Sequence, residues 1–196
     1  MPSSVLPSDC ISIDTLKFTK KPFQKRADVV EYWLHPIFVT PPQSTNKYAT
    51  CPFEFSLENM VMSCPPIKKG NKMIASFSAQ IDGPEYNFMK ALDDRLVKLL
   101  PCKDYNWSPL MCEEDGTIKV HLPLNSSGLP FLPCFRHGTN ERCSVYHIKQ
   151  GELIKIALNI GSIFVIDALE KKNKSGKVQC GAMVTVKHLE VFRKDV

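Results

Sequence analysis

The chain has 196 residues, of which 43% are hydrophobic and 23% are charged, and its formal net charge is +5. This length and balance are typical of one globular domain with a single sizeable core, so disorder throughout the chain is excluded. No apolar run approaches the roughly 18 residues of a membrane-spanning helix, and the modest positive charge permits nucleic-acid binding without requiring it.

The first part of the chain differs from the rest in being rich in proline and poor in periodicity. We expect residues 1–50 to form an N-terminal arm and packing segment, and residues 51–196 to form the globular domain. Within the arm, residues 17–26 place two phenylalanines among five basic side chains, and the apolar residues 29–39 are expected to pack on the domain. The first ten residues lack the basic start and apolar core of a secretory signal, so we expect an intracellular protein.

Two strands are predicted early in the domain, because apolar and polar residues alternate there. Phe53, Phe55 and Leu57 share one face of the first strand, opposite polar residues. In the second strand the apolar face extends from Met73 to Ile81. A half-buried sheet explains this period of two.

The pattern then changes to a helical period and back. A helix is predicted over residues 87–100, with Asn87 as its N-cap. A further strand follows, with Ile118, Val120 and Leu122 facing inward. The predicted buried stripe of the helix consists of Phe88, Leu92, Leu96 and Leu99.

The last third of the chain predicts two long, bent strands joined by a turn that carries four lysines. Gly161 interrupts the first strand, which indicates a bulge or a sharp bend. Strands that bend in this way are what a small closed barrel requires. The predicted inward residues are Ile154, Ile156, Leu158 and Ile160 in the first strand and Val178, Cys180, Ala182, Val184 and Val186 in the second.

Eight cysteines occur without any CxxC pair, and we expect reduced thiols that act as small buried apolar groups. A zinc-stabilised domain or small zinc enzyme stays an alternative, although the spacing of its ligands would be unusual. No common catalytic motif is present, so we expect neither an enzyme nor a cofactor. The ligands of the zinc alternative would come from Cys102, Cys112, Cys134, Cys143 and His137.

Basic turns and aromatic residues recur along the chain, which is the pairing that single-stranded nucleic acid requires. Lysines and arginines attract phosphates, while aromatic faces stack on bases. The candidate nucleic-acid-binding residues are Lys20, Lys21, Phe23, Lys25, Arg26, Trp33, Lys68, Lys69, Lys72, Tyr105, Trp107, Phe135, Arg136, Tyr146, Lys171, Lys172, Lys174 and Lys177.

The element order of residues 51–192, ending in a long hairpin with a lysine turn (GELIKIALNIGSIFVIDALEKKNKSGKVQCGAMVTVKHLEVF), resembles the OB-fold single-stranded DNA-binding proteins of large DNA viruses, of the baculovirus and nudivirus type. The resemblance implies a mainly β, OB-like five-stranded barrel with one capping helix. It also implies sequence-independent binding of single-stranded DNA during viral replication or recombination, in the host nucleus or at a viral replication site, with homo-oligomers along the strand. RNA as the ligand, and a protein-interaction module built on the same barrel, stay open as alternatives.

Overall fold

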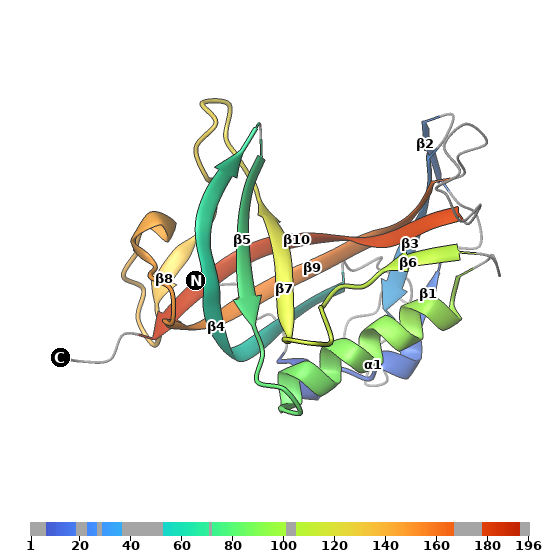
Figure 1. Cartoon of the computed structure of the whole chain (residues 1–196), viewed down its shortest axis with the longest axis horizontal. Coiled ribbons are helices and arrows are strands. Elements are labelled where there is room, and N and C mark those ends of the chain that lie inside the picture. The colour runs from blue at the N-terminus through green and yellow to red at the C-terminus, as the bar shows by residue number, and fades with distance from the viewer. Residues whose placement is uncertain are drawn as a thin grey trace, which may run out of the picture.

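The computed structural model describes residues 7–18, 23–26, 29–36, 53–70, 72–100, 105–166 and 178–192 (Figure 1). This part of the chain is mainly β, with a single α-helix. The helical elements are the 3-10 turns η1 (Ser8–Cys10), η2 (Ile13–Thr15) and η3 (Val145–His147) and the helix α1 (Pro84–Lys98). The strands are β1 (Leu16–Phe18), β2 (Phe23–Arg26), β3 (Val29–Pro36), β4 (Phe53–Lys69), β5 (Lys72–Ser78), β6 (Tyr105–Ser108), β7 (Thr117–Leu122), β8 (Cys134–Arg136), β9 (Leu153–Ile166) and β10 (Val178–Phe192). None of the described helices combines the length and the apolar character that crossing a bilayer demands.

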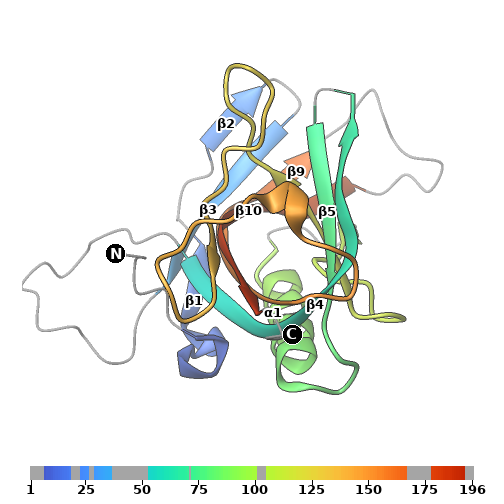
Figure 2. The ribbon, with the colours of Figure 1, turned by 90° about the vertical axis from the view of Figure 1, so that its left-hand side faces the viewer.

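The strands form one mixed sheet with β9 at its centre. One edge of β9 pairs with β4 and then β3, and its other edge pairs with β10, all antiparallel. Because β4 pairs with β5 and β5 with β7, the ladder follows the order β7–β5–β4–β9–β10. The short strands β6 and β8 join the remaining edge of β10 in parallel orientation. Figure 2 shows β4, β5 and β10 curving around a common interior.

The sheet is not closed, since no ladder joins β7 to β10 among the described strands. The predicted mainly β fold with one helix is confirmed, whereas the closed five-stranded barrel is not observed. Closure would need the outer edge of β10, and β6 and β8 already occupy both ends of that edge. The stretch after β7 contributes one further short strand, β8, to this edge.

The long hairpin of β9 and β10 bends where its register shifts. Met183 pairs with Ser162 and the next residue, Val184, pairs with Ile160, so Gly161 is an extra residue in β9. The bulge predicted at Gly161 is therefore confirmed. A second shift occurs on β10 between Val186 and His188. Bulges increase local twist, which explains how such long strands can curl.

The predicted inward faces form most of the core. The apolar positions expected to face inward in β4 and β7 are buried, as are the four isoleucine and leucine positions of β9 before the bulge. Two predicted inward positions of β10, Ala182 and Val184, are only half-buried. Ile81 was expected to complete the inward face of β5 but is 49% exposed, because β5 ends at Ser78 and a turn follows.

Helix α1 begins three residues before the predicted start. Gly83 is the N-cap and Pro84 is the first helical residue, where its fixed φ suits a helix and its missing N–H costs nothing. Asn87, the predicted cap, lies in the first turn and donates from Nδ2 to the carbonyl oxygen of Asp82 at 3.0 Å. Of the predicted stripe, Leu92 and Leu96 are fully buried, whereas Phe88 and Leu99 are half-buried.

The described N-terminal segments belong to the same sheet. β3 pairs with β9, and both β1 and β2 pair with β3. Arg95 of α1 donates from Nη2 to the carbonyl oxygens of Asp14 at 2.8 Å and Leu16 at 3.1 Å, which ties this region to the helix. The division of the chain near residue 50 stays a prediction, because residues 37–52 lie outside the described part.

Candidate functional site

The outer edge of β10 is paired only at its two ends. β6 pairs with Val178 to Gly181, and β8 pairs with Leu189 to Val191. Between them, residues 182–188 have no ladder partner on this side among the described strands. The neighbouring element across this window is β7, whose own outer edge is also unpaired within the described sheet. Two free strand edges therefore face each other.

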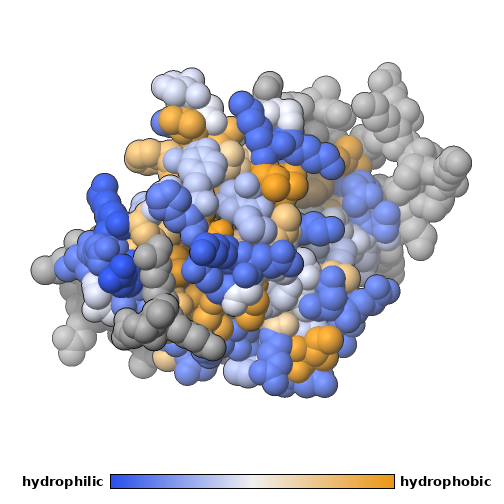
Figure 3. Space-filling view, turned by 60° about the vertical axis from the view of Figure 1, so that its left-hand side comes forward, coloured by the Kyte–Doolittle hydropathy of each residue, from blue (hydrophilic) through white to orange (hydrophobic). Residues whose placement is uncertain are grey.

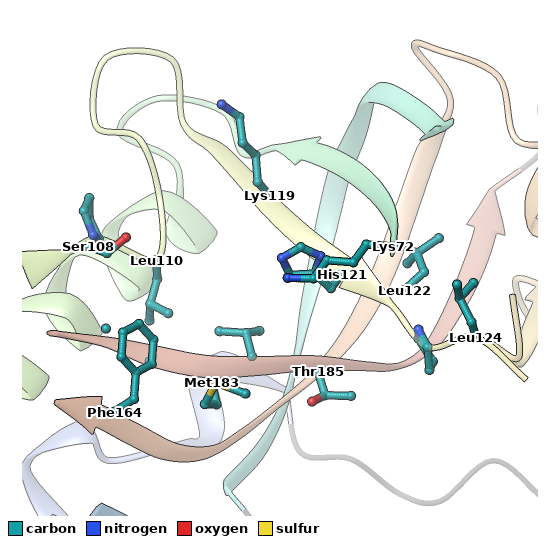
Figure 4. Close-up of a pocket in the computed structure, with 15 residues that line it drawn as sticks. Lys72, Ser108, Leu110, Lys119, His121, Leu122, Leu124, Phe164, Met183 and Thr185 are labelled. Atoms are coloured by element: carbon teal, nitrogen blue, oxygen red, sulfur yellow. The ribbon is translucent and has the colours of Figure 1, made fainter. Parts of the chain in front are cut away.

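A groove of about 750 Å³ lies between these edges (Figure 4). Its 15 lining residues come from β7 and the residues just after it, from the end of β6 and the segment that follows it, from β9, from β10 and from the start of β5. None of the lining residues is acidic. A groove lined without carboxylates favours an anionic or neutral ligand, because no negative charge in its lining would repel an anion.

The basic side of the groove consists of Lys72, Lys119 and His121, which are all exposed. Lys119 and His121 occupy outward positions of β7 and project from it toward the solvent side of the groove (Figure 4). Lys72 begins β5 and pairs with Lys69 across the β4–β5 hairpin. Within the described residues neither Lys72 nor Lys119 forms an ion pair, so both ammonium groups are available to a ligand.

The apolar side of the groove is built around Phe164 of β9. Its partner residue on β10 is Gly181. A Cβ atom at position 181 would lie 2.6 Å from Cζ of Phe164 and 3.3 Å from Cβ of Ser108. The ring can therefore lie against the β10 backbone only because residue 181 has no side chain. This half-buried ring stands at the end of the groove near Ser108 and Leu110 (Figure 4).

Further apolar residues extend this side. Met183 lines the groove and is 45% exposed. Phe131, which is 72% exposed, donates its backbone N–H to the carbonyl oxygen of the lining residue Pro123 at 2.8 Å. Figure 3 shows one face of the molecule on which apolar residues are exposed between hydrophilic ones. Unstacked bases are bound by aromatic faces beside basic residues, and the Phe164 ring is the aromatic lining residue of this groove.

One wall of the groove is held by a half-buried carboxylate of α1. Asp93 accepts hydrogen bonds from the backbone N–H of Leu110, at 3.0 Å to Oδ1 and 2.9 Å to Oδ2, and from Nε1 of Trp107 at 2.9 Å. Burial raises the pKa of Asp93 from 3.8 to about 6, although these hydrogen bonds favour the ionised form. The carboxylate thereby positions the segment between β6 and β7 without touching the groove itself.

Of the candidates predicted from the sequence, Lys72 lines this groove, and Lys68 and Lys69 are exposed on the same hairpin. Trp107 is half-buried, packs against the core and donates to Asp93. Tyr105 is half-buried in β6.

The remaining described candidates lie on other elements. Phe135 and Arg136 are half-buried in β8, where Arg136 forms an ion pair with Glu141 at 3.2 Å. Tyr146, in η3, is 50% exposed. None of these residues lines the groove, so their contacts with a ligand stay predictions.

The other candidates have no described side chains. Phe23, Lys25 and Arg26 belong to β2 and Trp33 to β3, for which the strand pairing is described. Six predicted lysines lie outside the described residues, namely Lys20, Lys21, Lys171, Lys172, Lys174 and Lys177.

Apart from Lys72, the residues that line the groove were missed by sequence reasoning, and those that matter most for its chemistry are Lys119, His121, Phe164 and Met183. Met183 carried a usable signal, since it is a large apolar residue at an outward position of a strand. Lys119 and His121 looked like ordinary solvent-facing residues of an alternating strand. Phe164 lies in a continuous apolar run, where sequence alone does not show which ring stays accessible.

The zinc alternative finds no support in the geometry. Among the described residues, no three His, Cys, Asp or Glu side chains gather as metal ligands would. His137 instead pairs with Glu190, with 2.9 Å between Nδ1 and Oε2, and stacks on Phe192 with 3.8 Å between the ring centroids. Cys102 lies outside the described residues.

Comparison with protein-family models finds no match for this chain, and comparison with curated proteins finds none either.

Proposed function

We propose that the chain binds single-stranded nucleic acid, DNA in the first place, independently of base sequence and in the groove between β7 and β10. The observation that carries this proposal is the composition of the groove. The groove combines the Phe164 ring and exposed apolar side chains with the cationic side chains of Lys72 and Lys119, and none of its lining residues is acidic. The role in viral DNA replication or recombination rests on the sequence resemblance alone.

In the proposed mechanism, Lys72 and Lys119 contact phosphates and release their counterions, while bases stack on Phe164 and pack against Met183. These interactions do not distinguish one base from another, because every base has an aromatic face and every nucleotide a phosphate. Binding of this kind requires no catalytic group and no cofactor. Neighbouring protomers along one strand would make the binding cooperative.

We also infer that the ladder β7–β5–β4–β9–β10 is an OB-like barrel. In chain order its five strands are β4, β5, β7, β9 and β10, and the barrel is open between the third, β7, and the fifth, β10. Its pairing order and its long bulged strands support this inference. OB-folds bind oligonucleotides on the face of strands 2 and 3 and with the loops between strands 1 and 2 and between strands 4 and 5. The corresponding parts here are the β5–β7 face, the β4–β5 hairpin and the lysine turn at residues 171–177.

The proposal is tested by fluorescence-anisotropy titration of labelled oligo-dT, oligo-U and duplex DNA with the full chain. We expect tight binding to oligo-dT and weak binding to the duplex, whose bases are stacked and unavailable. Replacing the aromatic ring by an aliphatic side chain in Phe164→Leu removes one stacking site, which weakens oligo-dT binding by about tenfold. The matched control is Phe88→Leu, since Phe88 packs on Phe55 with 5.1 Å between ring centroids and does not line the groove.

Two outcomes would count against this function. Similar weak binding to all three probes, abolished by salt, would reduce the interaction to general charge attraction. Equal effects of Phe164→Leu and Phe88→Leu would remove the groove as the binding site. In either case the unpaired edge of β10 would favour an extended peptide as the ligand, bound by strand addition.

A further inference from the structure

Two cysteine sulfurs lie next to each other at the start and end of the hairpin that contains β8. The Sγ atoms of Cys134 and Cys143 are 3.0 Å apart. Both side chains are present as thiols; Cys134 is buried and Cys143 is half-buried. A disulfide bond has a sulfur–sulfur length of about 2.05 Å, so a movement of about 1 Å would bring the two atoms into bonding distance.

The backbone of the hairpin already has the geometry that a cross-link needs. The N–H of Cys143 donates to the carbonyl oxygen of Cys134 at 2.9 Å, and Phe135 pairs with Arg142 in antiparallel orientation. Cys134 and Cys143 are thus directly opposite each other. In such a hydrogen-bonded pair the Cα atoms are about 5.5 Å apart, which lies within the range found for disulfides.

We propose that Cys134 and Cys143 form a reversible intramolecular disulfide when the folded protein meets a small-molecule disulfide such as glutathione disulfide. The more accessible Cys143 thiolate attacks one sulfur of the oxidant, which forms a mixed disulfide and releases one glutathione thiolate. The Cys134 thiolate then attacks Sγ of Cys143 and releases the second glutathione. Two protein thiols are oxidised and one glutathione disulfide is reduced to two thiols, with the two thiol protons passing to the released glutathione.

The cross-link would act on the C-terminal half of β10. β8 pairs with Leu189 to Val191, and the N–H of His137 donates to the carbonyl oxygen of Val191 at 3.0 Å. A covalent link between Cys134 and Cys143 therefore restrains the hairpin that contains β8, and through its pairing with β8 it also restrains this end of β10. This modification site is separate from the groove and does not depend on the proposed function.

The test uses the full chain, folded, in glutathione buffers of increasing oxidising strength, followed by blocking of free thiols with N-ethylmaleimide and tryptic mass mapping. Trypsin cleaves after Arg136 and Arg142, so Cys134 falls in the peptide 120–136 and Cys143 in the peptide 143–149, each with a single cysteine. We expect these two peptides to be recovered joined by a disulfide. Unfolding the chain before oxidation should lower the yield of this link by about tenfold, because the thiols lose their proximity.

Matched variants separate the pair from general thiol oxidation. Cys112→Ser, which removes an exposed cysteine outside the hairpin, should form the link as the natural sequence does. Cys134→Ser should leave Cys143 as a mixed disulfide with glutathione. The proposal is overturned if, in the unsubstituted protein, Cys143 carries glutathione or both thiols are recovered blocked under conditions that already oxidise Cys112.

Discussion

Asp93 is a single residue whose partial burial disfavours its charge, but whose hydrogen bonds hold Trp107 and Leu110 in place. Its carboxylate holds the Leu110 backbone and the Trp107 indole, and so fixes one wall of the groove. Burial raises its pKa from 3.8 to about 6, so the folded chain binds this proton more tightly than the unfolded chain does. The contribution of Asp93 to stability is therefore greatest below the pKa of the unfolded chain, 3.8, and is lost as the pH rises through the pKa of the folded chain, about 6.

The pH dependence can be tested with Asp93→Asn, which keeps a side-chain oxygen as acceptor and removes the charge. The pKa shift of about two units corresponds to roughly 1–3 kcal/mol once partial solvent screening is allowed for. The free energy of unfolding of the variant, relative to the natural sequence, should rise by that amount between about pH 4 and pH 7. Urea unfolding at several pH values measures it. Asp94→Asn, the exposed neighbour, is the control, and equal pH profiles for the two variants would contradict the assignment.

At the scale of elements, the β9–β10 hairpin contains two glycines with different tasks. Gly161 makes the bulge, and an added Cβ there would meet only Oδ1 of Asn159, at 3.7 Å. Gly181 makes room for the Phe164 ring, and an added Cβ there would overlap it. Neither glycine has a φ in the left-handed region, so the space around each one decides the effect of a substitution.

This difference predicts opposite results for the same substitution. Gly161→Ala should be neutral or stabilise the fold by up to about 1 kcal/mol, because alanine restricts the unfolded chain. Gly181→Ala should destabilise it by about 1–3 kcal/mol through overpacking, and should weaken oligo-dT binding as the ring is displaced. Urea midpoints and anisotropy titrations measure both effects. A similar loss of stability in both variants would show that the space at residue 181 is not the cause.

For the whole molecule, the positions of the charged residues matter more for binding a polyanion than the net charge does. The net charge of +5 is too small to concentrate a polyanion by itself. The groove combines its lysines with the lysines of the β4–β5 hairpin, whereas several described acidic residues are paired elsewhere, such as Glu113 with Lys90 at 2.9 Å and Glu54 with Lys187 at 3.0 Å. A single strand in the groove would therefore meet lysines that form no ion pair within the described part of the chain.

The salt dependence of binding should report these contacts. Each phosphate contact to a single strand adds about −0.7 to the slope of log K against log salt, so Lys72→Ala with Lys119→Ala should make the slope shallower by about 1.4. The control pair, Lys98→Ala with Lys149→Ala, changes the net charge equally at exposed positions outside the groove. Anisotropy titrations across a salt series measure the slopes. If both pairs of substitutions change the slope equally, the lysines act only through the total charge.

Much of the fold could be predicted from local patterns. The alternation in β4, β5, β7 and β9 identified the buried faces, because each strand has one face against the core. Gly161 identified the bulge, since a glycine inside an apolar strand has few other roles. The predicted start of α1 at Asn87 is three residues too late, because Pro84 is well suited to the first position of a helix and Gly83 serves as its cap.

The candidate site was predicted only in part, for a physical reason. The sequence by itself determined that this is a mainly β protein with bulged strands and lysines at its turns, because periodicity, glycine and turn chemistry act over a few residues. Only the tertiary structure placed Lys119 of β7, Phe164 of β9 and Met183 of β10 around one groove. An outward strand position has the same sequence pattern whether it faces solvent or a groove, and its neighbours are decided by pairings between strands far apart in the chain.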